Sequence, residues 1–149
     1  MSDAVLISTV LGGCGLLITL IYNYKNTQLA NHKMHKELFT EFNKKYDTLN
    51  GDLNYICSLS KGFFLEFDMG EDSRRLQTVI NDFFNLCAEE YYWSREKRIP
   101  KRVWKSWEKG MNDIYNQSEI IRHYWDEECK NEGHLSYYID RKDDFFKLR

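Results

Sequence analysis

The sequence predicts an all-α protein in which one N-terminal transmembrane helix continues into a cytoplasmic bundle of about five helices. Three observations predict this class. A charge-free apolar run lies near the N-terminus, apolar residues recur at helical spacing through the remainder, and no segment shows sustained period-two alternation. The chain has 149 residues with 21 Lys and Arg, 23 Asp and Glu, and a net charge of −2. These averages are typical of a soluble acidic protein, but every basic residue lies at or after Lys25.

This uneven charge divides the chain into two expected domains. Residues 1–24 carry a single charged side chain, Asp3, and are expected to form a transmembrane anchor. Residues 25–149 have the usual size of one domain, and we expect them to form a cytoplasmic helical domain. An aromatic content of 15% argues against a disordered chain, and four cysteines are too few for a disulfide scaffold.

Residues 4–22 contain no charged side chain. A helix of this length spans roughly 28 Å, close to the ~30 Å hydrocarbon core of a bilayer. A cleaved signal peptide would normally begin with basic residues, and a core helix would normally have a polar face. Lys25, Lys33 and Lys36 follow the run, so the positive-inside bias predicts that the N-terminus lies outside and the helical domain in the cytoplasm.

Small residues form a helical stripe within the anchor: Ser8, Gly12, Gly15 and Thr19. In lipid, helices associate through close backbone approach, which small side chains permit. The stripe therefore predicts a homo-oligomer, with these residues packing copies together or facing a pore. The alternative is that Gly, Ser and Thr are simply common in membrane helices.

Apolar residues at three- to five-residue steps predict helices throughout the cytoplasmic part. The expected boundaries are a break at Asn50-Gly51, an N-cap at Ser73, a new helix with Pro100 in its first turn, an N-cap at Ser118, a helix end at Gly133 and a last helix over residues 135–148.

Basic and aromatic residues are interleaved near the middle of the chain. The basic patch comprises Arg95, Lys97, Arg98, Lys101, Arg102 and Lys105. The tryptophans are Trp93, Trp104, Trp107 and Trp125. Aromatic and basic residues together are typical of a platform for single-stranded RNA, but tryptophans at helical spacing more often form core. We expect core for the tryptophans and a solvated patch for the basic residues, able to contact anionic lipid, RNA or a protein partner.

The chain lacks the motifs of common catalytic sites. It has no phosphate-binding loop, no dinucleotide fingerprint, no HExxH and no GxSxG. We therefore expect no enzymatic activity, no cofactor and no metal. Two sets of residues at helical spacing, His32 with His35 and Glu119 with His123 and Glu127, are weak metal candidates that more simply line a solvated helix face. The four cysteines show no zinc-type spacing.

The segment Arg98-Ile-Pro-Lys-Arg-Val-Trp-Lys-Ser-Trp107, followed by Trp125, resembles a recurrent bacterial pattern. It is similar to the small single-span membrane accessory proteins encoded beside the RNA-targeting effector of type VI-B CRISPR systems. The resemblance implies a HEPN-like helical fold, a ring in the bacterial inner membrane, and a pore that strengthens antiviral immunity. It also implies a functional link to an RNA-guided effector. The alternative function is a membrane-tethered adaptor that binds a protein or RNA partner through residues 95–105, without pore or catalytic activity.

Nucleic-acid-cleaving HEPN domains use an Arg followed four to six residues later by a His. Here Arg122 directly precedes His123, and no Arg precedes a His by the required spacing. We interpret this pair as at most a degenerate remnant of a nuclease site, which agrees with a non-enzymatic relative.

Overall fold

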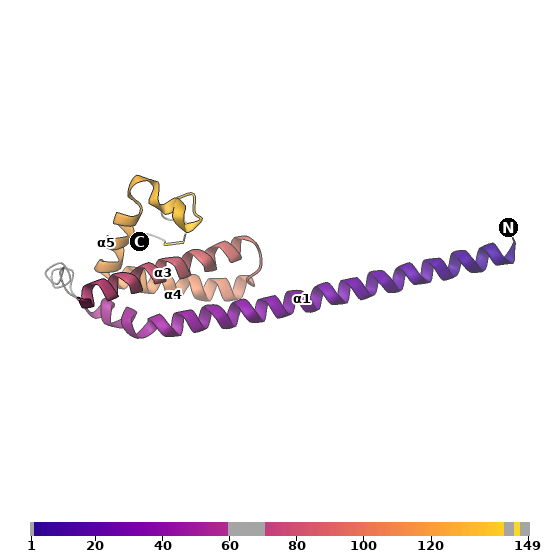
Figure 1. Cartoon of the computed structure of the whole chain (residues 1–149), viewed down its shortest axis with the longest axis horizontal. Helices are drawn as coiled ribbons and strands as arrows, with labels where there is room; N and C mark the ends of the chain where they lie inside the picture. The colour runs from indigo at the N-terminus through magenta and orange to yellow at the C-terminus, as the bar shows by residue number, and fades with distance from the viewer. Residues whose placement is uncertain (1, 60–70, 142–144, 147–149) are drawn as a thin grey trace. The chain divides into compact units, whose positions relative to one another are not determined.

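The computed structural model describes residues 2–59, 71–141, 145 and 146. In chain order these residues form α1 (Asp3–Ser58), α3 (Glu71–Arg95), α4 (Lys101–Gln117), α5 (Glu119–Glu128) and the 3-10 helix η1 (Lys130–Tyr137) (Figure 1). No strand occurs in these ranges. The predicted all-α class is therefore confirmed for the described part of the chain.

The chain divides into two compact units, residues 1–38 and residues 39–149. The first unit consists of the N-terminal part of α1, and the described side chains of residues 2–30 are all exposed. The second unit contains the remainder of α1, the other described helices and the buried apolar side chains of the described residues, from Phe42 to Phe146. The hydrophobic core therefore lies entirely within the second unit.

α1 continues through Asn50 and Gly51 without interruption, so the predicted break there is wrong. An interior glycine costs a helix only about 1 kcal/mol relative to alanine. Leu53 and Ile56, on the turns that follow, are 1% and 0% exposed. Their burial stabilises the last turns of α1 by more than the glycine costs, because each buried side chain contributes roughly 1.5–3 kcal/mol.

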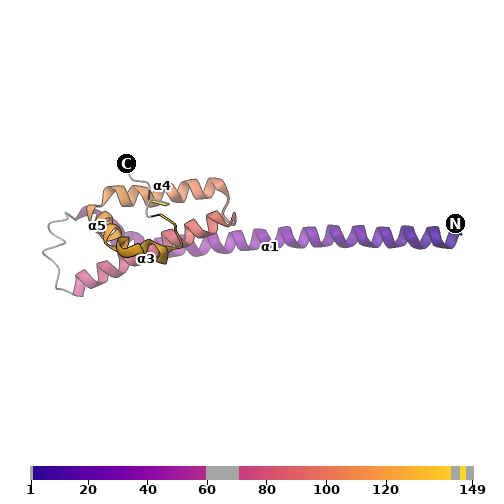
Figure 2. The same cartoon turned by 90° about the horizontal axis from the view of Figure 1, so that it is seen from above.

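Residues 39–58 of α1 pack with α3 and α4 around this core. Lys45 pairs with Glu89 at 2.6 Å, and Asp52 pairs with Arg75. Since the residue numbers rise along α1 as they fall along α3, the two helices are antiparallel. α3 and α4 are themselves joined by a short turn and run in opposite directions, as Figure 2 shows.

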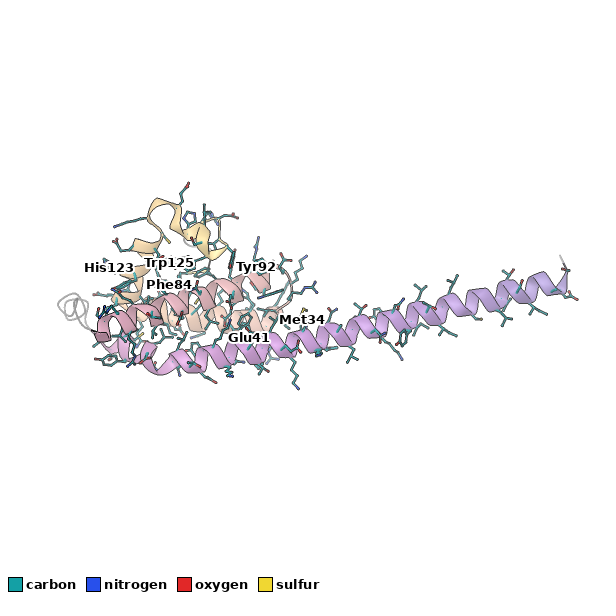
Figure 3. All side chains as sticks on the ribbon, in the orientation of Figure 1. Met34, Glu41, Phe84, Tyr92, His123 and Trp125 are labelled. Atoms are coloured by element: carbon teal, nitrogen blue, oxygen red, sulfur yellow. The ribbon has the colours of Figure 1, made fainter. Side chains whose placement is uncertain are left out.

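Aromatic side chains form much of the core between α3, α5 and the C-terminal residues. The ring centroids of Phe84 and Trp125 lie 4.9 Å apart, and both side chains are labelled in Figure 3. Tyr115 stacks on Phe146 with centroids 4.4 Å apart. Trp125 is 1% exposed, so its prediction as a core residue is confirmed. Trp93, Trp104 and Trp107 are half-buried.

The turn between α3 and α4 is a Schellman motif, which ends a helix with one residue in the left-handed conformation. That residue is Lys97, with φ 57°. The Arg98 amide donates to the Trp93 carbonyl at 3.0 Å, and the Lys97 amide donates to the Ser94 carbonyl at 3.1 Å. Pro100 is the N-cap of α4. It therefore lies just before the first helical turn in which it was predicted.

The remaining predicted boundaries were partly right. Ser118 caps α5 as expected, accepting a hydrogen bond from the Ile121 amide at 3.2 Å. Ser73 is not an N-cap, because α3 begins at Glu71 and the Ser73 side chain is buried within it.

The C-terminal predictions were largely wrong. α5 ends at Glu128, well before Gly133, which lies inside η1. Of the helix expected over residues 135–148, residues 135–137 belong to η1, whereas residues 138–141 are not helical. Phe145 and Phe146 lie in a bend with both rings buried. Residues 142–144, 147 and 148 lie outside the described residues. Phe145 and Phe146 therefore enter the core as two buried rings rather than as one face of a helix.

Candidate functional site

The N-terminal part of α1 presents apolar side chains without any protein covering them. Leu11, Leu16 and Leu20 are 67%, 69% and 64% exposed. Among the described helices, α1 has the length and the apolar composition that a membrane-crossing helix needs. Removing such side chains from water contributes about 25 cal/mol per Å² of apolar area, so this surface favours a lipid or protein environment.

The small-residue stripe occupies one face of this helix. Because α1 is helical throughout, Ser8, Gly12, Gly15 and Thr19 fall within an arc of about 60°. A Cβ atom added at Gly12 or Gly15 would meet nothing within 4 Å. The Thr19 hydroxyl donates to the Gly15 carbonyl at 2.9 Å, which satisfies its hydrogen bond within the helix. The stripe is therefore an uncovered face of small side chains. The Thr19 hydroxyl would carry its hydrogen bond with it into lipid.

The basic patch lies at the C-terminal end of α3, on the turn between α3 and α4, and on the first two turns of α4. All six of its side chains are exposed: Arg95, Lys97, Arg98, Lys101, Arg102 and Lys105. None of them forms an ion pair with another described residue. The Arg95 guanidinium lies 6.0 Å from the centre of the Tyr91 ring. The Schellman turn therefore displays a concentrated positive charge that is open to an anionic partner.

Arg122 has a structural role at the junction of α4 and α5. Its guanidinium donates to the carbonyl oxygens of Tyr115, at 3.2 Å, and of Asn116. These carbonyls belong to the last turn of α4, where they have no partner within the helix, and a cation is favoured there by the helix dipole. The neighbouring His123 packs edge-on against Tyr124, with ring centroids 5.9 Å apart. The position of Arg122 is explained by helix capping.

The structure does not gather Glu119, His123 and Glu127 into a metal site, and among the described residues it adds no third ligand to His32 and His35. No group of three or more His, Cys, Asp or Glu side chains able to hold a metal ion occurs among the described residues. Glu127 is instead paired with Lys130 at 2.7 Å. The hydrogen bond from Lys130 lowers the pKa of the Glu127 carboxyl.

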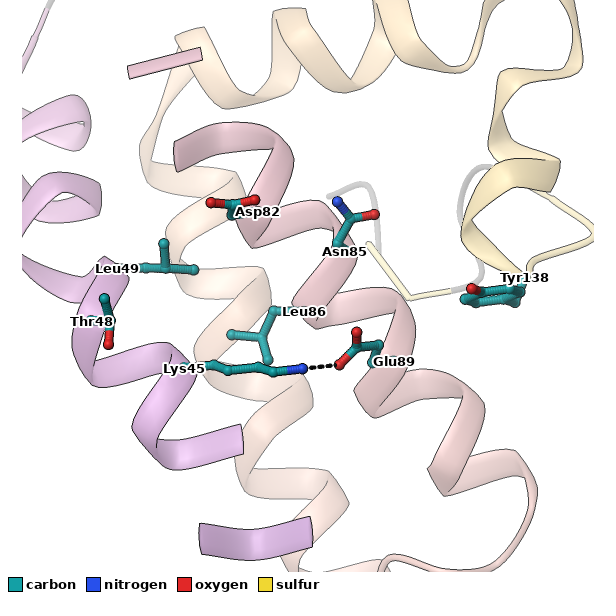
Figure 4. A pocket seen from close by; sticks show the side chains of 8 residues that line it. All are labelled: Lys45, Thr48, Leu49, Asp82, Asn85, Leu86, Glu89 and Tyr138. Carbon is teal, nitrogen blue, oxygen red and sulfur yellow. Dashed lines mark hydrogen bonds and ion pairs between the residues drawn. The ribbon is translucent and has the colours of Figure 1, made fainter. Parts of the chain in front are cut away.

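The second unit has an open depression of about 470 Å³ on the side where α1 meets α3. It is lined by Lys45, Thr48, Leu49, Asp82, Asn85, Leu86, Glu89 and Tyr138 (Figure 4). The figure shows the Lys45 ammonium pointing at the Glu89 carboxylate across the groove between the two helices.

Lys45 is suited to holding these two helices together. It also approaches Glu41 at 3.3 Å, and its hydrogen bond to Glu89 raises the pKa of its ammonium group. Lysines that act as nucleophiles or bases have a lowered pKa, because they must lose their proton near neutral pH. A raised pKa keeps Lys45 charged and paired, which is a structural arrangement.

A smaller cavity, of about 190 Å³, lies between α1, α3 and α4. Its wall includes the carboxyl group of Glu90, which is 7% exposed. Burial is the main cause that raises the pKa of this carboxyl to about 8. Sequence inspection did not single out Glu90, but a signal existed. Glu90 continues the apolar stripe of α3 through Phe83 and Cys87, where a carboxylate is unexpected.

Comparison with known proteins identifies no relative of this chain. The chain matches no family model, no curated protein and no solved structure.

Proposed function

We propose that this protein is a single-span membrane protein of prokaryotic antiviral defence that assembles through its anchor and carries no catalytic activity. The observation that carries the membrane assignment is the uncovered apolar surface of α1, where residues 4–22 carry no charge. A bilayer removes that apolar surface from water. Within the bilayer, the helix satisfies its own backbone hydrogen bonds.

The proposed orientation places the helical domain in the cytoplasm, at the bacterial inner membrane. Lys25, Lys33 and Lys36 follow the apolar run, whereas Asp3 is the only charged side chain before it. Basic residues near the end of a span remain on the cytoplasmic side. Tyr22 and Tyr24 are exposed at the same end, as in the aromatic belts of membrane helices.

Self-association of the anchor is the next step of the proposal. Gly12 and Gly15 leave space on one face of α1 for a second backbone to approach closely. Packing of this kind drives helix association in lipid, where the hydrophobic effect between helices is absent. In a ring of copies, Ser8 and Thr19 would place hydroxyl groups on the same face, toward neighbours or a central opening.

The defence role rests on the resemblance of residues 98–107 and Trp125 to the type VI-B CRISPR accessory proteins. In this proposal the assembled spans form a pore that strengthens the immunity given by an RNA-targeting effector. Co-expression with such an effector in bacteria challenged by phage tests it. The native chain should increase protection, and a chain that gives no increase with any type VI-B effector contradicts the defence role.

The assembly is tested by light scattering after size-exclusion chromatography in detergent. We expect the native chain to be oligomeric and the variant with Gly12→Leu and Gly15→Leu to shift toward monomer, because leucine side chains hold the helices apart. The matched control carries Val10→Leu and Ile21→Leu, on the opposite face of α1, and should keep the native size. A native chain that is strictly monomeric would refute assembly through the anchor.

The exposed basic patch favours one alternative function. In it the anchor only tethers the protein, and residues 95–105 bind a protein or RNA partner without pore activity. Charge reversal by Lys101→Glu, Arg102→Glu and Lys105→Glu should then abolish partner capture from cross-linked cells, with Lys44→Glu as an exposed control. Span variants that retain membrane insertion should have no effect in this alternative, which distinguishes it from assembly through Gly12 and Gly15.

A further inference from the structure

The cavity of about 190 Å³ in the second unit combines apolar and aromatic walls with one buried acid. α1 contributes Asn43 and Tyr46, and α4 contributes Trp107 together with Ser106, Gly110 and Met111. α3 contributes Glu90 beside Phe83, Leu86 and Cys87. The walls therefore come from three different helices of one compact unit, which holds their positions through the surrounding core.

Glu90 has no charged or hydrogen-bonding partner in this wall. Glu90 is 7% exposed, and no hydrogen bond or ion pair to its side chain occurs among the described residues. Every fully buried side-chain oxygen in these residues has a hydrogen-bond partner, so the Glu90 carboxyl oxygens keep some access to solvent. Lys45 forms an ion pair with the preceding residue, Glu89. A carboxyl group that lines a cavity without a protein partner is available to a ligand, and carboxyl groups with a perturbed pKa in clefts are common at functional sites.

No basic side chain lines the cavity to complement this acid. Three titratable groups interact electrostatically with Glu90: Tyr46 from α1, and Cys87 and Glu89 from α3. None of them is a cation. The residues that α4 places in the wall carry no charge. The described wall of the cavity therefore supplies no positive charge to pair with Glu90 when its carboxyl is ionised.

We propose that this cavity binds a small organic ammonium ion, with its cationic nitrogen on the Glu90 carboxylate and its apolar part among the aromatic side chains. Trp107 and Tyr46 add aromatic rings to the wall, and cations are attracted to ring faces within about 6 Å. Asn43 and Ser106 add polar groups that can orient a substituent on the ligand.

The volume limits the size of the ligand. An engineered cavity of about 150 Å³ holds benzene, so a cavity of about 190 Å³ admits a molecule of about eight non-hydrogen atoms. Benzylamine has this size and is protonated at neutral pH. Benzyl alcohol has the same shape without the charge. For ligands this small, dissociation constants on the order of a millimolar are expected.

Proton release accompanies binding. Near neutral pH the Glu90 carboxyl carries a proton, because burial raises its pKa to about 8. An ammonium ion binds the carboxylate form, so that proton passes to the buffer when the complex forms. The affinity for benzylamine should therefore rise by up to about tenfold per pH unit as pH approaches 8 from below.

The experiment uses the full chain in detergent micelles with ¹³C-methyl-labelled methionine. The sequence has four methionines, and Met111 lines the cavity, so its methyl signal reports on the site. The signal is assigned by its loss in Met111→Leu. Benzylamine should shift it saturably and bind at least tenfold more tightly than benzyl alcohol at pH 8. Between pH 6.5 and 7.5 the affinity for benzylamine should rise several-fold, and that for benzyl alcohol should not.

Two variants make the test specific. Glu90→Gln keeps the size of the side chain and should weaken benzylamine binding at least tenfold while leaving benzyl alcohol unchanged. Gly110→Leu should block both ligands, since Gly110 lines the cavity and a Cβ there meets nothing within 4 Å. Equal affinity for the two ligands, full affinity in Glu90→Gln, or no saturable shift of Met111 in the native chain would each overturn the proposal.

Discussion

At the residue scale, Glu90 couples the stability of the helical domain to pH. In the unfolded chain its carboxyl ionises above its usual pKa of 4.5, whereas burial raises the pKa to about 8 in the folded protein. Between these values unfolding releases a proton. The free energy of unfolding therefore falls as pH rises, by up to about 1.4 kcal/mol per pH unit, and the contribution is lost by about pH 8.

Glu90→Gln removes this titration and keeps the shape of the side chain. We expect the variant to be more stable than the native chain at pH 8 by more than about 1 kcal/mol, with the difference shrinking toward pH 5. Urea denaturation of both proteins at pH 5, 6.5 and 8, followed by circular dichroism, measures the effect. Parallel stability curves across this range would show that Glu90 does not carry the proton assigned to it.

Arg122 and His123 are adjacent in sequence but differ in what they contact. Arg122→Ala leaves the terminal carbonyls of α4 without their donor and should lower the free energy of unfolding by roughly 1–2 kcal/mol. His123→Ala removes one ring contact and should change it by less than about 0.5 kcal/mol. Thermal unfolding of both variants in the same detergent tests this difference. Equal losses, or RNA cleavage by the native chain that either variant abolishes, would contradict the capping role of Arg122.

At the element scale, glycines within helices act in two opposite ways. Gly51 lies in α1 with nothing within 4 Å of an added Cβ, so alanine there relieves the entropic cost of glycine. Gly133 lies in η1, where an added Cβ would overlap the carbonyl group of Glu128. A glycine-to-alanine substitution is therefore tolerated at Gly51 in α1, whereas at Gly133 in η1 it causes a steric clash with the backbone.

We expect Gly51→Ala to raise the free energy of unfolding by about 0.5–1 kcal/mol and Gly133→Ala to lower it. Chemical denaturation of the two variants beside the native chain measures both changes. The two substitutions serve as controls for each other because they differ only in location. A destabilising Gly51→Ala would indicate that α1 is not a regular helix at this position.

At the scale of the whole molecule, the buried apolar side chains of the described residues belong to one of the two compact units. Among the described side chains, those that are apolar and buried all lie at or after Phe42, within the unit formed by residues 39–149. The fold of that unit therefore depends on contacts among α3, α4, α5, η1 and the last part of α1. The exposed residues of the first unit contribute none of the buried core.

Removal of residues 1–24 should leave a domain that folds on its own without detergent. We expect helical circular dichroism and one cooperative thermal transition, because the whole core remains. The full chain in detergent provides the comparison for helix content. A truncated protein that aggregates or melts without cooperativity would show that the first unit is needed for folding.

The sequence alone determined the all-α class, the apolar helix at the N-terminus and the Ser118 cap. Each depends on local spacing, on length, or on a side chain that reaches its own backbone. The basic patch was also evident from its composition, and the structure adds the Schellman turn that exposes it.

Only the tertiary structure decided the continuity of α1 at Gly51, the early end of α5 and the irregular course that buries Phe145 and Phe146. In each case packing against distant residues outweighs local preference, which is worth only about 1 kcal/mol per residue. The same holds for the cavity at Glu90. Its wall brings together side chains from α1, α3 and α4 that lie far apart in the sequence, so no local pattern encodes the enclosure that raises the pKa of its carboxyl.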